Sequence, residues 1–289
     1  MTAQTLDAPA IAKAWTNRPR VWVLAEEEFR RAVESRWLFT FAALFALFVL
    51  GLSYFGLAQS REVGFQSFAR VTLSLLNLVL FTVPLAGLLL GVSSLAGNDG
   101  LSLLLAQPVS RREVLLGKLL GLGGAFSAAQ MLGFGGGGVV VAMSAGSDGV
   151  RGFAVLCALS LALGWLTCAT ALCIAAIWPD RLRAMSAALG LWVLMVVAYD
   201  LAVLGATTLL NGIPLQSVLL PALLLNPVDL ARVLVTLAVG AGALFGPTSA
   251  VLVHTLGSAH GIALGVCVLI VETVVPLLVA MYVFERRDW

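Results

Sequence analysis

Six long apolar stretches restrict the fold of this chain more than any other feature. They cover residues 37–58, 71–96, 122–145, 153–178, 184–210 and 261–284. Each is long enough to cross a bilayer as a helix, which needs about 20 apolar residues. Charged residues make up 11% of the chain, against about 25% in soluble domains. Because so few charges cannot cover a water-facing surface, we expect an all-α membrane protein with six transmembrane helices.

The basic residues fall mainly on one side of these spans and thereby predict the orientation of the chain. With the N-terminus inside, thirteen of the seventeen lysines and arginines lie in inner segments: Lys13, Arg18, Arg20, Arg30, Arg31, Arg36, Arg111, Arg112, Lys118, Arg181, Arg183, Arg286 and Arg287. The other four lie outside: Arg61, Arg70, Arg151 and Arg232. Since cytoplasmic loops carry an excess of Lys and Arg, we expect both termini to be cytoplasmic.

The segment 211–260 allows two interpretations. Residues 228–254 are apolar enough for a seventh span, but they carry Asp229 and Arg232 near one end and several helix-breaking residues in the middle. A seventh span would also place the arginines at the C-terminus outside. We therefore expect an outer segment of interfacial or packed helices. One of these helices should begin at the Asn-Pro pair 226–227, with Asn as the N-cap and Pro as the first helical residue.

The region before the first span divides into a flexible segment, 1–18, and an amphipathic helix, 19–36. Apolar side chains recur there at spacings of three or four and share one face: Trp22, Ala25, Phe29, Val33 and Trp37. The pairs Glu26–Arg30 and Glu27–Arg31 have the spacing that supports a helix. A basic amphipathic helix that adjoins a span is expected to lie along the inner membrane surface; the alternative is a soluble packing helix.

Motifs for nucleotide, metal or nucleic-acid binding are absent or out of context. The glycine-rich run 133–138 fits a GxGxxG pattern, but it lies inside an apolar span without the strand that a dinucleotide site requires. Together with Gly117 and Gly121, it predicts close helix packing. The chain lacks a P-loop, so ATP must be hydrolysed, if at all, in another subunit. The scattered histidines and cysteines predict no metal site, and the absence of a basic stripe argues against nucleic acid. We expect no catalytic, cofactor-binding or metal-binding residue in this chain.

Two acidic residues lie within the predicted spans. Asp200 is far enough along its helix to reach the outer interface, whereas Glu272 lies near the middle of the last span. Charges inside a membrane are costly and are candidates for functional sites. For Glu272, a functional role and a protonated or hydrogen-bonded packing role are about equally supported.

The inner loop 97–121 combines turns with a short apolar run. A Gly-Asn-Asp-Gly sequence follows the second span, residues 101–106 are apolar, and Gln-Pro at 107–108 forms a turn. Ser110 and Glu113 have the spacing of a capping box, which predicts that the next helix begins here. A short helix held by turns across the inner face could transmit force from a cytoplasmic partner.

At this loop the sequence resembles a known family. NDGLSLLLAQPVSRREVLLGK at 98–118 is similar to the loop of type 2 ABC transporter permeases, in which an acid and Gly-Thr-Leu precede an apolar run, Pro-[Val/Ile]-Ser-Arg and Leu-Gly-Lys. EEEFRR at 26–31, SRWL at 35–38 and FERRD at 284–288 agree with the same family, so the resemblance covers the whole chain in order. This sequence departs from the family at Asn98, where Glu is usual, and at 101–102, where Leu-Ser replaces Gly-Thr.

The family resemblance implies a non-catalytic subunit in the bacterial inner membrane. It implies an elbow helix at 19–36, a transmembrane domain at 37–289, a cytoplasmic coupling loop at 97–121 and a periplasmic segment at 211–260. Two chains would form a homodimer with two ATPase subunits, which would bind ATP and Mg. The implied ATPase-coupling residues are Asn98, Asp99, Leu103, Pro108, Arg111, Arg112, Asp180 and Arg181.

Within the family, the long outer segment and LNPVDLAR at 225–232 resemble permeases that serve copper-site maturation of nitrous oxide reductase. This resemblance implies a periplasmic accessory protein that contacts Asn226, Asp229 and Arg232. The alternative is a general type 2 exporter of lipid, drug or ion without a dedicated periplasmic partner. An intramembrane enzyme and a copper channel are both disfavoured, because the acids, methionines and cysteines of the spans do not cluster.

Overall fold

The computed structural model describes residues 20–58, 65–97, 109–209, 221–239 and 257–287. Within these ranges the chain forms helices and no strand. They are α2 (Arg20–Glu34), α3 (Arg36–Ala58), α4 (Phe65–Leu95), α6 (Arg111–Ile177), α7 (Arg181–Val193), the π-helix η1 (Leu194–Ala198), α8 (Tyr199–Leu209), α10 (Pro227–Ala238) and α12 (Ala259–Arg286). The segment 1–18, most of 211–260 and the loop residues Asn98, Asp99, Leu103 and Pro108 lie outside the described ranges.

The predicted number of transmembrane helices is confirmed. In the described part of the chain, six helical segments are long and apolar enough to cross a membrane: Arg36–Phe55, Val71–Leu95, Arg111–Val139, Val150–Ile177, Arg181–Val203 and His260–Arg286. The helix α10 has 12 residues and is therefore only about 18 Å long, too short for a hydrocarbon core about 30 Å thick. The described part of 211–260 thus holds a packed helix and not a seventh span.

The third span begins at Arg111, earlier than the start at 122 that hydropathy predicts. Ser110 is the N-cap of α6, and its side chain accepts a hydrogen bond from the Glu113 N–H at 3.2 Å. The Glu113 carboxylate accepts one from the Ser110 N–H at 2.7 Å. This reciprocal pair is the predicted capping box, and it fixes the first turn of the helix.

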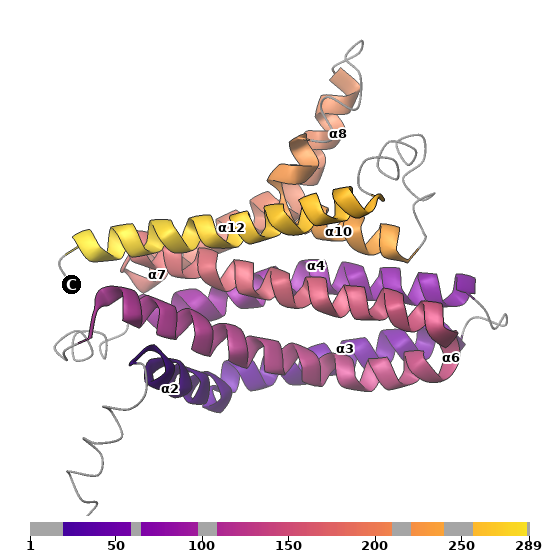
Figure 1. The fold of residues 1–289 in the computed structure, drawn as a ribbon, viewed down its shortest axis with the longest axis horizontal. Coiled ribbons are helices and arrows are strands. Elements are labelled where there is room, and N and C mark those ends of the chain that lie inside the picture. The colour runs from indigo at the N-terminus through magenta and orange to yellow at the C-terminus, as the bar shows by residue number, and fades with distance from the viewer. Residues whose placement is uncertain (1–19, 59–64, 98–108, 210–220, 240–256, 288–289) are drawn as a thin grey trace, which may run out of the picture.

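α6 contains both the third and the fourth span. Its 67 residues would extend about 100 Å if they formed one straight rod, but the ribbon folds back on itself (Figure 1). The Ser160 hydroxyl donates to Gln130 Oε1 at 2.6 Å, and Trp165 Nε1 donates to Ser127 Oγ at 3.0 Å. These contacts show that the two halves pack side by side and antiparallel.

The second, third and fourth spans form the centre of the molecule. In their most apolar windows 61–67% of the residues are buried, compared with 22% in the first span and 11% in the fifth and sixth. The central core contains large side chains that are almost fully buried, among them Leu75, Leu88, Leu122, Phe126 and Leu163. The fifth and sixth spans therefore present most of their apolar side chains to the surroundings.

Glycines let α2 and α3 approach α6 closely, as the small-residue pattern predicts. A Cβ atom on Gly121 would lie 2.6 Å from the Ala25 carbonyl oxygen, and one on Gly117 would lie 2.5 Å from Leu24 Cβ. Further along α6, Gly133 faces Phe45 and Gly137 faces Val49. The glycine-rich run thus packs against α3.

The apolar face predicted for the N-terminal helix is exposed at its large residues. Trp22, Phe29 and Val33 are 62%, 41% and 48% exposed, whereas Ala25 is buried against α6. Arg31 pairs with Glu27 at 2.8 Å, as the spacing predicts, and Arg30 also binds Glu27. α2 is thus held to α6 on one side and presents aromatic side chains on the other.

Candidate functional site

The start of α6 binds the end of α12 at the end of the bundle that carries α2 and the C-terminus (Figure 1). Arg111 Nη1 donates to the carbonyl oxygens of Phe284 at 2.9 Å and Glu285 at 3.1 Å, and also to that of Arg287. Carbonyl groups in the last turn of a helix have no donor within the helix. Arg111 therefore caps the C-terminal end of α12.

Two further arginines complete this contact. Arg112 Nε and Nη2 both bind the Glu285 carboxylate, the second at 3.2 Å. Arg287 in turn donates to the carbonyl oxygen of Ala176 at 3.0 Å and to that of Ile177, in the last turn of α6. We call Arg111, Arg112, Glu285 and Arg287 the terminal clasp. It joins both ends of α6 to the end of α12.

The second predicted coupling segment lies beside the end of α4. Asp180 is the N-cap of α7 and accepts a hydrogen bond from the Arg183 N–H at 2.9 Å. Gly97, the first residue of the predicted loop, donates its N–H to the Pro179 carbonyl at 3.0 Å and has φ of +64°. A Cβ atom at Gly97 would lie 3.0 Å from Arg181 Cβ. The structure thus brings the start of the predicted loop and the Asp180–Arg181 turn together.

A buried ion pair at the same end was not predicted. Lys118 Nζ lies 2.9 Å from Glu28 Oε2 and donates to the Ser94 carbonyl at 2.8 Å. The two charged side chains are only 6% and 13% exposed, so Lys118 joins α2, α4 and α6 in the interior. The sequence carried no signal for this pair, because Arg31, three positions after Glu28, is a nearer candidate partner on the same helix.

Toward the other end, four of the predicted polar residues meet in one cluster. Arg232 Nη1 lies 3.1 Å from both carboxylate oxygens of Asp200 and 2.7 Å from Asp229 Oδ1. The Asn226 side-chain amide donates to Asp229 Oδ2 at 3.1 Å. Burial raises the pKa of Asp229 to about 6, although Arg232 opposes this effect. The sequence assigned Asp200 to the membrane and the other three to an outer surface; the structure shows that they form one site.

This cluster surrounds an irregular turn in the fifth span. In an α-helix the Met195 carbonyl would accept from the Tyr199 N–H, but in η1 that N–H donates to Leu194 O. The Asn226 side chain instead donates to Met195 O at 2.8 Å. The Tyr199 hydroxyl donates to the Ala222 carbonyl. Beyond η1, α8 points away from the other helices (Figure 1).

Glu272 lies in the middle of α12, as the sequence predicts. It is half-buried, and its Oε2 atom is buried without a hydrogen-bond partner among the described residues.

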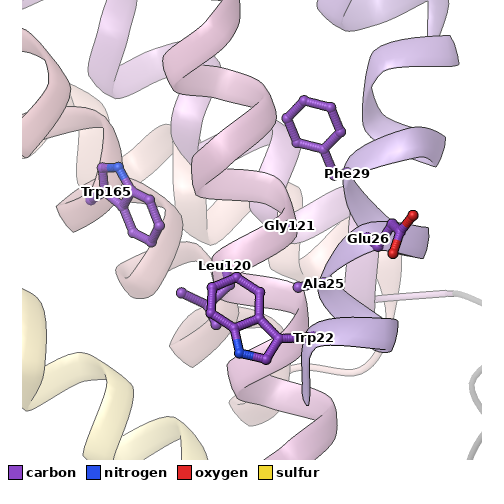
Figure 2. A pocket seen from close by; sticks show the side chains of 7 residues that line it. All are labelled: Trp22, Ala25, Glu26, Phe29, Leu120, Gly121 and Trp165. Atoms are coloured by element: carbon purple, nitrogen blue, oxygen red, sulfur yellow. The ribbon is translucent and has the colours of Figure 1, made fainter. Parts of the chain in front are cut away.

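An apolar groove of about 650 Å³ runs between α2 and the hairpin of α6 (Figure 2). Trp22, Ala25 and Phe29 line it from α2, and Leu120, Gly121 and Trp165 from α6. Trp165 is held by its hydrogen bond to Ser127 and packs on Gly123. The Glu26 carboxylate points away from the groove (Figure 2), so its walls are formed by apolar side chains.

Comparison with known proteins agrees with the sequence and the fold. A family model described as "ABC-2 family transporter protein" matches residues 22–289. The chain is 33% identical to a protein of Stutzerimonas stutzeri over 281 residues, which cover 93% of this chain and 99% of the relative. It is 37% identical to a protein of Pseudomonas aeruginosa over 226 residues, which cover 75% of this chain and 81% of the relative. Both relatives are named "Probable ABC transporter permease protein NosY".

Proposed function

The chain belongs to the ABC-2 family of transporter proteins, and from this premise we propose that it is the permease subunit of an ABC transporter for copper-site maturation of nitrous oxide reductase. The observation that carries the proposal is the similarity to the NosY relative from Stutzerimonas stutzeri, which extends over 99% of that protein. The six spans and the packed outer helix α10 are consistent with it. ATP and Mg would be bound by a separate ATPase subunit.

The end with the terminal clasp is assigned to the cytoplasm, where the ATPase would bind. This end carries most of the basic residues, and cytoplasmic segments are enriched in Lys and Arg. It also holds Gly97, Asp180 and Arg181 side by side, next to the loop in which the other proposed coupling residues lie. Force from ATP hydrolysis would enter the permease here and reach α12 through the clasp.

The proposed assembly is a homodimer with two ATPase subunits and a periplasmic accessory protein. The first, fifth and sixth spans have exposed apolar faces, for example Phe39 at 73%, Leu201 at 64% and Leu278 at 57%, which lipid or a second copy would cover. The segment with Asn226, Asp229 and Arg232 meets the fifth span at Met195, past its middle on the side away from the clasp, and would face the accessory protein.

The proposal is tested by deleting the gene in the source organism and restoring it on a plasmid. We expect the deletion strain to produce nitrous oxide reductase that lacks copper and to accumulate nitrous oxide. Copper per reductase chain, the visible absorption of the purified reductase and nitrous oxide consumption are the measurements. A fully copper-loaded reductase in the deletion strain would contradict the maturation role and favour the general exporter.

ATPase coupling is tested separately, in the complex purified through a tag on this chain. We expect an ATP-binding subunit to co-purify and its ATPase activity to depend on the permease. Arg112→Glu should reduce complex yield or ATPase stimulation. Arg111 is left unchanged in this variant, because it caps α12 and its replacement would also disturb the fold. Unchanged yield and stimulation in Arg112→Glu would remove this residue from the proposed contact.

A further inference from the structure

We propose that the fifth span bends at a hinge, η1, and that residues 222–232 act as a latch that sets the bend. Three contacts form this outer latch: Asn226 with Met195 O, Tyr199 with Ala222 O, and Arg232 with Asp200. All three join the turn at 195–200 to one outer segment. The hinge and the latch lie within this one chain, and they extend the proposed function because a periplasmic partner could act on them.

The hinge follows from the backbone of the fifth span. A π-helical turn interrupts the regular hydrogen bonding between α7 and α8, and such turns are common at functional sites. The irregular turn contains no proline or glycine, so the chain sequence alone does not force it. A side chain that supplies a donor to a helix carbonyl is a known cause of a sharp bend, and Asn226 does this at Met195 O.

The latch and the hinge residue Val196 are fixed to the core, whereas the described start of α8 beyond the hinge is exposed. α10 buries Val228, Leu230, Val233 and Val235 against the centre of the molecule, and Asn226 itself is 2% exposed. In contrast, Leu201 in α8 is 64% exposed. Ala202 beside it is exposed as well, so the polar latch contacts, rather than side-chain packing, hold the described start of α8.

The latch combines contacts that can break one at a time. Asn226 is held on both sides, since it also caps α10 by accepting from the Val228 N–H at 3.1 Å. The side chains of Arg232 and Asp200 are 29% and 41% exposed, so the described part of the chain does not enclose their pairing. A partner that moves the 222–232 segment or competes for Arg232 would therefore release α8. This last step depends on the proposed accessory protein, whereas the hinge and latch do not.

The test measures distances between spin labels in the purified full chain, reconstituted in lipid nanodiscs. In a variant with the four native cysteines replaced by alanine, labels at Leu201→Cys and Ile262→Cys report α8 against α12. Labels at Leu182→Cys and Leu278→Cys report the distance between the inner half of the fifth span and α12. All four positions are exposed, so the labels should not disturb the core.

Variants of the latch should change the outer distance alone. Asn226→Ser keeps a capping oxygen but is too short to reach Met195, and Tyr199→Phe removes only the hydroxyl. We expect the outer distance distribution to shift or broaden in each, further in the double variant, while the inner distribution stays unchanged. Thr236→Val is the matched control, because Thr236 is also buried in α10 but bonds only to Arg232 O within its own helix.

The proposal is overturned if the double variant keeps the wild-type outer distribution, or if inner and outer distances change together. If the double variant does not fold, Tyr199→Phe alone still tests the latch, because it keeps the aromatic ring and removes only the hydroxyl group. Neither readout requires an ATPase, a reductase or a partner. The two proposals can therefore fail independently. A chain without a role in copper maturation could still have the hinge, and a rigid fifth span would not contradict the copper-maturation role.

Discussion

Arg111 and Arg112 are neighbours in the sequence but are held in different ways. Arg111 donates to backbone carbonyls at the end of α12, which have no donor within their own helix. Arg112 binds the Glu285 side chain and is 67% exposed. Arg111 should therefore contribute more to the stability of the fold than Arg112, although both were predicted to contact an ATPase.

Replacing each arginine by alanine should separate these roles. Arg111→Ala leaves carbonyls without their charged donor and should lower the free energy of unfolding by about 1–3 kcal/mol. Arg112→Ala removes a solvent-exposed pair and should change the free energy of unfolding much less. Thermal unfolding in detergent and hydrogen exchange at 282–287 are the measurements. Equal effects of the two variants would contradict the assignment of the cap to Arg111.

The Lys118–Glu28 pair should behave as a buried pair. Lys118→Met leaves Glu28 almost buried without its partner, and breaking such a pair costs about 3–5 kcal/mol. The double variant Lys118→Met with Glu28→Met should regain most of this loss, because neither charge remains. A double-mutant cycle of unfolding free energies checks this. Additive losses in the double variant would show that the two side chains do not interact.

The contacts between distant residues could not be read from the sequence. Asp200 and Glu272 were recognised as intramembrane acids, but the partner of Asp200 is Arg232, 32 positions away, and no helical spacing relates them. Lys118 and Glu28 are 90 positions apart. The sequence therefore indicates which polar residues need partners, whereas tertiary packing decides which partners they meet.

At the scale of elements, hydropathy predicted the spans well and their ends less well. A span needs a long apolar stretch, and that signal is strong in all six. The third span was placed too late because Arg111, Arg112 and Lys118 resemble loop residues. In the structure the capping box starts the helix at Arg111, and Glu28 neutralises Lys118, so the helix continues through these charges. The π-helical turn had no recognised signal, because it depends on Asn226.

The contact of α2 with α6 gives a prediction at this scale. Gly121→Ala would place a methyl group 2.6 Å from the Ala25 carbonyl oxygen and 2.9 Å from the Phe29 nitrogen. Both are backbone atoms, so α2 must shift. We expect Gly121→Ala to lower the unfolding temperature and to increase hydrogen exchange in α2.

Gly135→Ala is the matched control, on the same helix. Nothing lies within 4 Å of a Cβ atom at Gly135, and alanine favours a helix over glycine by up to about 1 kcal/mol. This variant should therefore be neutral or stabilising. If both variants destabilise the chain alike, close approach of α2 is not the reason for Gly121.

At the scale of the whole molecule, the described residues at both ends of the chain lie at one end of the bundle (Figure 1). An even number of spans requires this arrangement. Which end faces the cytoplasm follows from charge alone, and the predicted orientation places α2 inside and the turn of the α6 hairpin outside.

Labelling of single cysteines in whole cells checks this orientation. In a variant without native cysteines, Val150→Cys should react with a membrane-impermeant maleimide, because it lies at the hairpin turn and is 46% exposed. Arg30→Cys on α2 should react only after the cells are permeabilised. The reverse pattern would show that the basic end faces outward and would contradict the proposed site of the ATPase.

The terminal clasp has a consequence for how the molecule is made. Residues 284–287 are synthesised more than 100 residues after the end of the α6 hairpin at Ile177. Arg111 is therefore made long before the carbonyl groups of α12 that it binds, and the contact of Arg287 with the last turn of α6 also needs this late segment. The clasp can close only once residues 284–287 have been made, so a chain truncated before Phe284 would leave open the end where the ATPase is proposed to bind.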